Sequence, residues 1–386
     1  MKKARLTPPA TARSMMMCAA AIVLATSSSS ESERRHYFPD SQLVLEMATL
    51  SHAVYRLRNK VTSCRDDKNI QNNNSSSNSN SSGNRKNSTQ IHDDDDDEND
   101  LFQRLLPVGT KCLYYSHDYS IGTQVLVVRS NLHNYVVVAY AGTDDWRTAL
   151  TDGDVLMSDF GPRIMDDHPG NNNTSTSGTR DNNTNDDIRS IFENNVPDGI
   201  RVHRGFNEAV FNSNDFLKLL KCVASARLGG ACCHDGDDGG CPGNEEKSLY
   251  SNRSASYQLL TTGHSLGAAD ATLLGAALHL AYPHEKIRSV NFGGPKIGNI
   301  AWSFWINSLQ PDKKDWERDS ISTSSSSSSS SSGSYEIFRF VNKIDLVPRL
   351  PEILPPLTHA GHTLQMSVGG GIKVSVCNPL KWTLCM

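Results

Sequence analysis

Several features that mark other classes of protein are missing from this sequence. Its 386 residues have a net charge of only −4 at pH 7, so no excess of positive charge favours a nucleic-acid partner. No two cysteines have C-x-x-C spacing, which argues against a zinc site at Cys232, Cys233 and Cys241. The apolar run over 15–25 is too short to span a bilayer comfortably, so no transmembrane segment is predicted.

Acidic residues are also absent from the start of the chain until Glu31. The same stretch contains the basic residues Lys2, Lys3, Arg5 and Arg13. The apolar run follows them, and Val23-Leu24-Ala25 is a plausible cleavage site, so residues 1–25 are predicted to be a signal peptide. We therefore expect the protein to be secreted or to reside in the endomembrane lumen. A plastid transit peptide has similar features and remains the alternative.

Cysteine usage agrees with export. Removal of Cys18 with the signal would leave eight cysteines, an even number that fits an oxidising compartment. We predict disulfides between Cys64 and Cys112 and between Cys377 and Cys385. Glycosylation sequons start at Asn73, Asn80, Asn87, Asn172, Asn182 and Asn252.

Four segments have compositions that bury too little apolar surface to enter a core. They are rich in Asn, Ser, Asp or Gly and cover residues 65–100, 163–190, 228–254 and 312–334. We interpret them as loop insertions. The rest of 26–386 then has the size of one ordinary domain.

The most informative motif is Gly263-His264-Ser265-Leu266-Gly267, a G-x-S-x-G sequence. An apolar, strand-like run over 257–262 precedes it, and an Ala/Leu-rich helical stretch over 268–278 follows. Strand, tight turn and helix are the setting of a nucleophile elbow, in which flanking glycines let the backbones approach and the serine is held out at the turn. Ser265 is therefore a candidate nucleophile, and the backbone N–H of Leu266 is a candidate oxyanion donor.

Further strands are predicted around this motif. An amphipathic helix over 43–58 comes first, followed by β-branched runs over 124–128 and 135–140. The second run ends in Gly142-Thr143, so Thr143 lies at the carboxyl end of a strand, where it can supply the second oxyanion donor. Two more strands are predicted over 287–292 and 335–342.

A carboxylate and a histidine follow the serine in the chain order of elbow hydrolases. Asp345 comes just after the strand over 335–342, and His359 follows fourteen residues later. His203 precedes the serine and is rejected as the base. His264 is expected to pack beside the nucleophile.

These motifs together resemble the class 3 (fungal-type) lipase family. They cover residues 140–152, 202–209, 259–274, 290–299, 339–351 and 359–364. The resemblance implies an α/β-hydrolase fold, a mostly parallel sheet with helices on both faces, in which Ser265, His359 and Asp345 form a triad and Thr143 and Leu266 an oxyanion hole. The family pattern His-x-Gly fits His359 and not His362. Ala141, Ala149 and His362 depart from the usual pattern, which puts the substrate range in doubt more than the chemistry.

The expected activity is hydrolysis of lipid esters through an acyl-enzyme, without metal or organic cofactor. Acylglycerols at a lipid–water interface are the first candidates for substrate. A phospholipase A1, a galactolipase and a feruloyl-type esterase are alternatives, and a non-catalytic lipid-binding homologue or an acyltransferase is a further possibility. Trp146 and Leu150, four residues apart after Thr143, are predicted to lie on one apolar face of a lid. The oligomeric state cannot be predicted.

Overall fold

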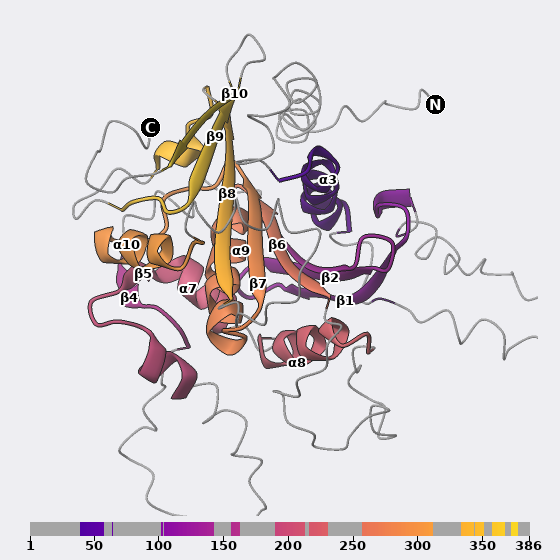
Figure 1. The fold of residues 1–386 in the computed structure, drawn as a ribbon, viewed down its shortest axis with the longest axis horizontal. Coiled ribbons are helices and arrows are strands. Elements are labelled where there is room, and N and C mark those ends of the chain that lie inside the picture. Colours follow the sequence, from indigo (N-terminus) through magenta and orange to yellow (C-terminus); the bar gives the residue numbers. More distant parts are fainter. Residues whose placement is uncertain are drawn as a thin grey trace, which may run out of the picture.

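The computed structural model describes residues 39–57, 64, 102, 104–142, 156–162, 190–212, 216–230, 257–311, 333–342, 344–350, 357–366 and 372–376. Most of its strands form one large twisted sheet in the middle of the molecule (Figure 1). The helices are α3 (Ser41–Leu57), α7 (Arg204–Phe211), α8 (Phe216–Arg227), α9 (Leu266–Ala281) and α10 (Ile300–Ser308). The strands are β1 (Thr110–Asp118), β2 (Thr123–Ser130), β3 (Tyr135–Ala141), β4 (Met157–Asp159), β5 (Arg201–His203), β6 (Gln258–His264), β7 (Lys286–Phe292), β8 (Ser334–Asn342), β9 (His362–Met366) and β10 (Ile372–Val376). A short 3-10 helix, η2 (Val347–Arg349), follows β8.

The main sheet has eight strands in the order β1-β2-β3-β6-β7-β8-β9-β10. The five neighbouring strands from β3 to β9 pair in parallel, whereas the outer pairs β1–β2, β2–β3 and β9–β10 are antiparallel. Because parallel strands end at the same edge of a sheet, the chain leaves β3, β6, β7 and β8 at one edge. That edge is the place where open α/β sheets bind ligands.

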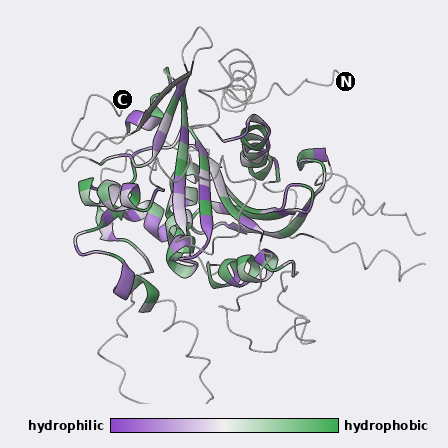
Figure 2. Ribbon diagram, in the orientation of Figure 1, coloured by the Kyte–Doolittle hydropathy of each residue, from purple (hydrophilic) through white to green (hydrophobic). Residues whose placement is uncertain are grey.

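Both faces of the sheet are covered by helices. Along β3, Val136, Val138 and Tyr140 belong to the apolar cluster on the first face of the sheet. Val137 and Ala139, which alternate with them, belong to the apolar cluster on the second face. Helix α3 packs on the second face, and α7, α8, α9 and α10 pack on the first. In Figure 2 hydrophobic and hydrophilic residues are interspersed along the strands, and buried apolar side chains lie on both faces of the sheet, as expected for a sheet without a solvated face.

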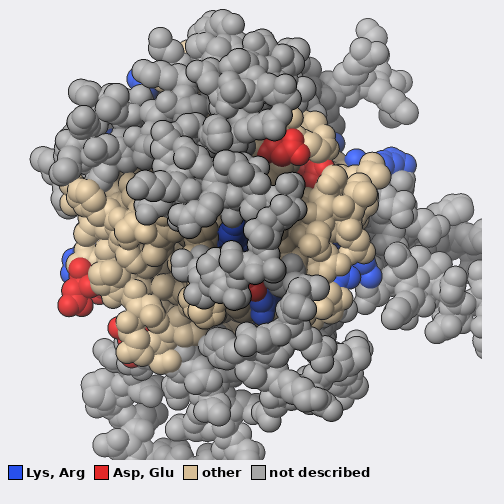
Figure 3. Space-filling model, viewed as in Figure 1, with Lys and Arg blue, Asp and Glu red and all other residues tan. Residues whose placement is uncertain are grey.

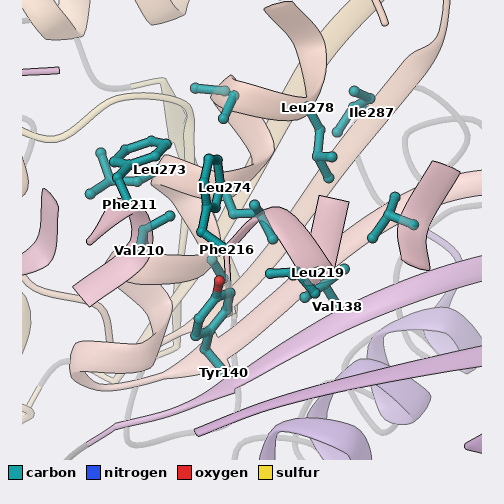
Figure 4. Close-up of a cluster of buried hydrophobic side chains, with 14 of the residues drawn as sticks. Val138, Tyr140, Val210, Phe211, Phe216, Leu219, Leu273, Leu274, Leu278 and Ile287 are labelled. Atoms are coloured by element: carbon teal, nitrogen blue, oxygen red, sulfur yellow. The ribbon is translucent and has the colours of Figure 1, made fainter. Parts of the chain in front are cut away.

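The cluster on the α9 face is shown in Figure 4, where side chains from β3, α7, α8 and α9 meet. Tyr140 of β3 lies below Phe216, and Leu273 and Leu274 of α9 point toward the same interior. Each fully buried side chain of this kind stabilises the fold by roughly 1.5–3 kcal/mol. Helix α9 is therefore buried around almost its whole circumference and fixes the turn that precedes it.

The predicted α/β architecture is confirmed, with strand boundaries within about two residues for β2, β3, β7 and β8. The opening helix is α3. The sequence after His203, which has a helical pattern to about Arg227, forms two helices, since α7 ends with its C-cap at Asn212 and α8 begins at Phe216. The sequence patterns do not predict β1, β4, β9 or β10.

The disulfide between Cys64 and Cys112 is present, with a Cα–Cα distance of 5.8 Å, and confirms that prediction. Residues 1–25, Cys377 and Cys385 lie outside the described residues, as do the predicted insertions apart from a few terminal positions. None of the helices in the described ranges is both long enough and apolar enough to cross a bilayer. On the face in Figure 3, the acidic and basic side chains of the described residues occur in small separate groups.

Candidate active site

Ser265 occupies the turn between β6 and α9, as the elbow motif predicts. Its φ is 57° and its ψ −126°, a region that residues with a side chain rarely adopt, and only one other described non-glycine residue, Asn134, has a positive φ. The backbone N–H of Ser265 is held by the carbonyl of Phe292 at the end of β7, 3.0 Å away. The serine is therefore fixed in a strained conformation at the carboxyl edge of the sheet.

The two glycines of the motif are required by close backbone contacts. A Cβ at Gly263 would lie 2.1 Å from the carbonyl oxygen of Gly267, and a Cβ at Gly267 would lie 2.6 Å from the carbonyl oxygen of Tyr140. Both obstacles are backbone atoms, which cannot rotate away as a side chain can. The glycines thus let α9 pack directly on β6 and β3.

We predict that Gly263→Ala destabilises the protein by about 3 kcal/mol or more and reduces hydrolysis, because the added methyl must separate α9 from β6. Thermal unfolding and activity on a soluble ester would measure both effects. Gly205→Ala in α7 is the matched control, since its Cβ would meet only the His203 side chain, at 3.2 Å. Equal melting temperatures for the two variants would contradict the prediction.

The loop after β3 lies against the elbow. A Cβ at Gly142 would be 3.1 Å from the backbone nitrogen of Leu266 and 2.8 Å from the carbonyl oxygen of His264. Thr143, Trp146 and Leu150 lie outside the described residues. The structure therefore brings the residue before Thr143 to the backbone of Leu266.

Asp345 follows β8 at the same edge. Its carboxylate accepts a hydrogen bond of 3.0 Å from the backbone N–H of Val347. Burial raises the pKa of this carboxyl, and the bond from Val347 opposes the rise. A Cβ at Gly293, just after β7, would meet Oδ2 of Asp345 at 2.8 Å, so the carboxylate lies over the end of the neighbouring strand.

His359 is almost completely buried, with 2% of its surface exposed. Its Nε2 lies 2.6 Å from the carbonyl oxygen of Pro348 in η2, in the loop that also contains Asp345. Because a carbonyl only accepts, Nε2 bears the hydrogen and Nδ1 has the free lone pair. Neither Ser265 nor Asp345 is hydrogen-bonded to the His359 ring among the contacts of the described residues.

The surroundings of His359 favour its neutral form. Burial holds the pKa of this histidine well below its usual value, and the cations of Arg339 and Lys296 lower it further. Only the Pro348 carbonyl favours the protonated ring. A neutral imidazole can accept a proton, which is the condition for a general base.

Three other histidines have surroundings that indicate a packing role. His203 ends β5, and its ring contacts that of Phe206 at a centroid distance of 4.6 Å. His264 is half-buried beside the elbow, and desolvation, aided by the charge of His52, lowers its pKa to about 4. His362 opens β9 and stacks on Phe338 with ring centroids 5.5 Å apart.

Two residues that lie near the site were not predicted from the sequence. The hydroxyl of Tyr55 in α3 contacts the elbow. It was missed because an aromatic residue in an amphipathic helix is typical of an ordinary core position. Arg339 is buried in β8, where its Nε donates to the Ala360 carbonyl at 3.0 Å and its guanidinium also contacts Thr363. A charged residue between Phe338 and Phe340 in a buried strand was a signal for a structural or functional role.

A mostly parallel sheet, helices on both faces and a serine elbow at the carboxyl edge define an α/β-hydrolase fold. Residues 173–354 match the lipase (class 3) family, which confirms the resemblance in the sequence motifs. The match includes Ser265 and Asp345, begins after Thr143 and ends before His359.

Individual relatives are distant. The lipases of Rhizopus niveus and Rhizopus oryzae are each 21% identical over 190 residues, which cover 48% of this chain and 33% of theirs, so the chain spans about a third of the length of these relatives. Among solved structures, lipase II from Rhizopus niveus has a TM-score of 0.47 at 17% identity, covering 87% of this chain and 85% of that one. The Rhizomucor miehei triacylglyceride lipase has a TM-score of 0.43 at 16% identity, covering 70% and 71%.

Proposed function

We propose that the protein is a secreted serine hydrolase of carboxylic esters, with acylglycerols as its main substrates. The observation that supports this most strongly is Ser265 at positive φ on the strand-turn-helix between β6 and α9, with the backbone of Leu266 against the loop after β3. The match to the lipase (class 3) family supports the same class of reaction. A serine held this way is suited to attack a carbonyl whose oxygen receives backbone N–H donors.

In the proposed reaction, a lone pair of His359 accepts the proton of Ser265 as Oγ attacks the ester carbonyl. The developing oxyanion is bound by the N–H of Leu266 and by Thr143. The protonated ring then gives its proton to the departing alcohol, and a water molecule repeats the two steps on the acyl-enzyme. Asp345 orients the ring and stabilises its charged form.

This sequence of steps requires the His359 side chain to exchange its bond with Pro348 for contacts with Ser265 and Asp345. Catalytic hydrogen bonds often form only in the complex with substrate. The segment with Trp146 and Leu150 is proposed as a lid whose apolar face meets lipid when it opens.

The function is tested with purified protein on triolein, phosphatidylcholine, monogalactosyldiacylglycerol and p-nitrophenyl esters of graded chain length. We expect release of fatty acid from triolein, and a sharp rise in rate on a short-chain ester once its solubility limit is exceeded. Preference for a phospholipid, a galactolipid or a soluble ester would assign one of the narrower alternatives. No hydrolysis of any ester, together with no labelling of Ser265 by a fluorophosphonate, would refute the proposal.

The pH dependence follows from the lowered pKa of His359. Since the base must be neutral and its neutral form is favoured, the acid limb of kcat/KM is expected below pH 6.5, the ordinary histidine value. Lys296→Met removes one of the cations that lower this pKa, so the limb should move to higher pH. Lys286→Met, at the exposed amino end of β7, is the control and should leave the limb unchanged. An acid limb above pH 6.5 in the parent protein would contradict the assignment of His359.

A further inference from the structure

The hydroxyl of Tyr55 joins two segments of the candidate site. It accepts a hydrogen bond from the backbone N–H of Gly142 at 2.8 Å and donates one to the carbonyl of His264 at 3.1 Å. The same oxygen lies 3.3 Å from Nδ1 of His264. Gly142 immediately precedes Thr143, and His264 immediately precedes Ser265. A single side-chain atom thus contacts the loop after β3 and the strand end that leads into the nucleophile.

Helix α3 is fixed so that Tyr55 reaches this position. One turn earlier, the hydroxyl of Ser51 lies 2.8 Å from that of Thr262 in β6, in the buried interface between helix and sheet. Thr262 also contacts the carbonyl of Met47 at 3.3 Å. Because residues four apart share a helix face, anchoring Ser51 on β6 directs Tyr55 toward the carboxyl end of the same strand.

The two segments that Tyr55 joins must keep a fixed separation for an oxyanion hole to work. A Cβ added at Gly142 would lie 3.1 Å from the nitrogen of Leu266 and 2.5 Å from the Tyr55 hydroxyl, so Gly142 packs closely against both groups. Donors to a developing oxyanion act through exact placement, and a shift of a few tenths of an ångström weakens them.

We infer that Tyr55 is a positioning residue for ester hydrolysis, whose hydroxyl fixes the loop after β3 against the elbow and so sets the spacing of the oxyanion hole. The inference rests on the proposed function and adds a residue outside the triad and the oxyanion donors. Tyr55 acts through Gly142 and His264 and is not required to touch the substrate. Its loss should therefore weaken stabilisation of the transition state while leaving the binding of the acyl chain intact.

Tyr55→Phe removes only the hydroxyl and is the direct test. We expect kcat on a soluble p-nitrophenyl ester to fall about tenfold with KM within twofold of the parent value, less than the loss of an oxyanion donor itself. The rate at which a p-nitrophenyl phosphonate modifies Ser265 should fall by the same factor, because its phosphoryl oxygen uses the same donors. The melting temperature reports whether the variant folds normally.

Tyr135→Phe is the matched control. The Tyr135 hydroxyl also joins α3 to the sheet, through a bond of 2.5 Å to Glu46, but at the amino end of β3. If Tyr135→Phe lowers kcat as much as Tyr55→Phe, or if Tyr55→Phe leaves kcat and phosphonate labelling unchanged, the inference is wrong. An inactive parent protein, or a Ser265→Ala variant as active as the parent, would instead refute the proposed function.

Discussion

Ser265→Ala is expected to lower the hydrolysis of every ester substrate by roughly a thousandfold or more, because no acyl-enzyme can form without the hydroxyl. The side chain makes no hydrogen bond within the described part of the chain, and alanine meets the same backbone restriction at φ 57°. The melting temperature should therefore change little. Initial rates and thermal unfolding of the same preparation measure both effects.

Ser130→Ala is a suitable control for this variant. Ser130 is a buried serine at the end of β2, where its hydroxyl accepts the N–H of His133, and it lies at the opposite edge of the sheet from the elbow. We expect nearly full activity in this control. A Ser265→Ala variant that keeps more than a few per cent of the parent rate would remove Ser265 from the role of nucleophile.

The elbow could be predicted because its requirements are local. Two glycines around a serine, after an apolar strand and before an Ala-rich helix, specify the turn without information from elsewhere in the chain. The contacts of Gly263 and Gly267 are the physical reason for that pattern. The core strands β2, β3, β7 and β8 were similarly evident from their apolar runs.

The rest of the site depends on contacts between distant segments, which a sequence does not encode locally. Tyr55 and Gly142 are 87 residues apart, and His359 contacts a carbonyl in a loop whose shape periodicity cannot predict. Strand β1 escaped prediction because its residues do not alternate cleanly between buried and exposed positions. The register that places Arg339 beside Asn291 and Thr363 is likewise a property of the assembled sheet.

The second large effect is expected at His359 and not at His362. His359→Ala removes a buried ring from the loop beside η2 and Asp345, and hydrolysis should fall by roughly a thousandfold or more, as for other losses from a triad. His362 is three residues later, but it belongs to β9 and packs on Phe338, on the face of the sheet that α3 covers. His362→Ala should therefore keep most of the activity and lose about 1 kcal/mol of stability through the lost ring contact.

Added imidazole separates loss of a base from loss of structure. If His359 supplies the lone pair, free imidazole should restore part of the rate of His359→Ala by entering the space that the ring vacates, and it should not affect Ser265→Ala. Rates on a soluble ester, measured with and without imidazole at a pH where the added base is neutral, test this expectation. An inactive His362→Ala variant beside an active His359→Ala variant would assign the base to His362, although the sheet register pairs this residue with Phe338 in the middle of β8 and not with the end of that strand.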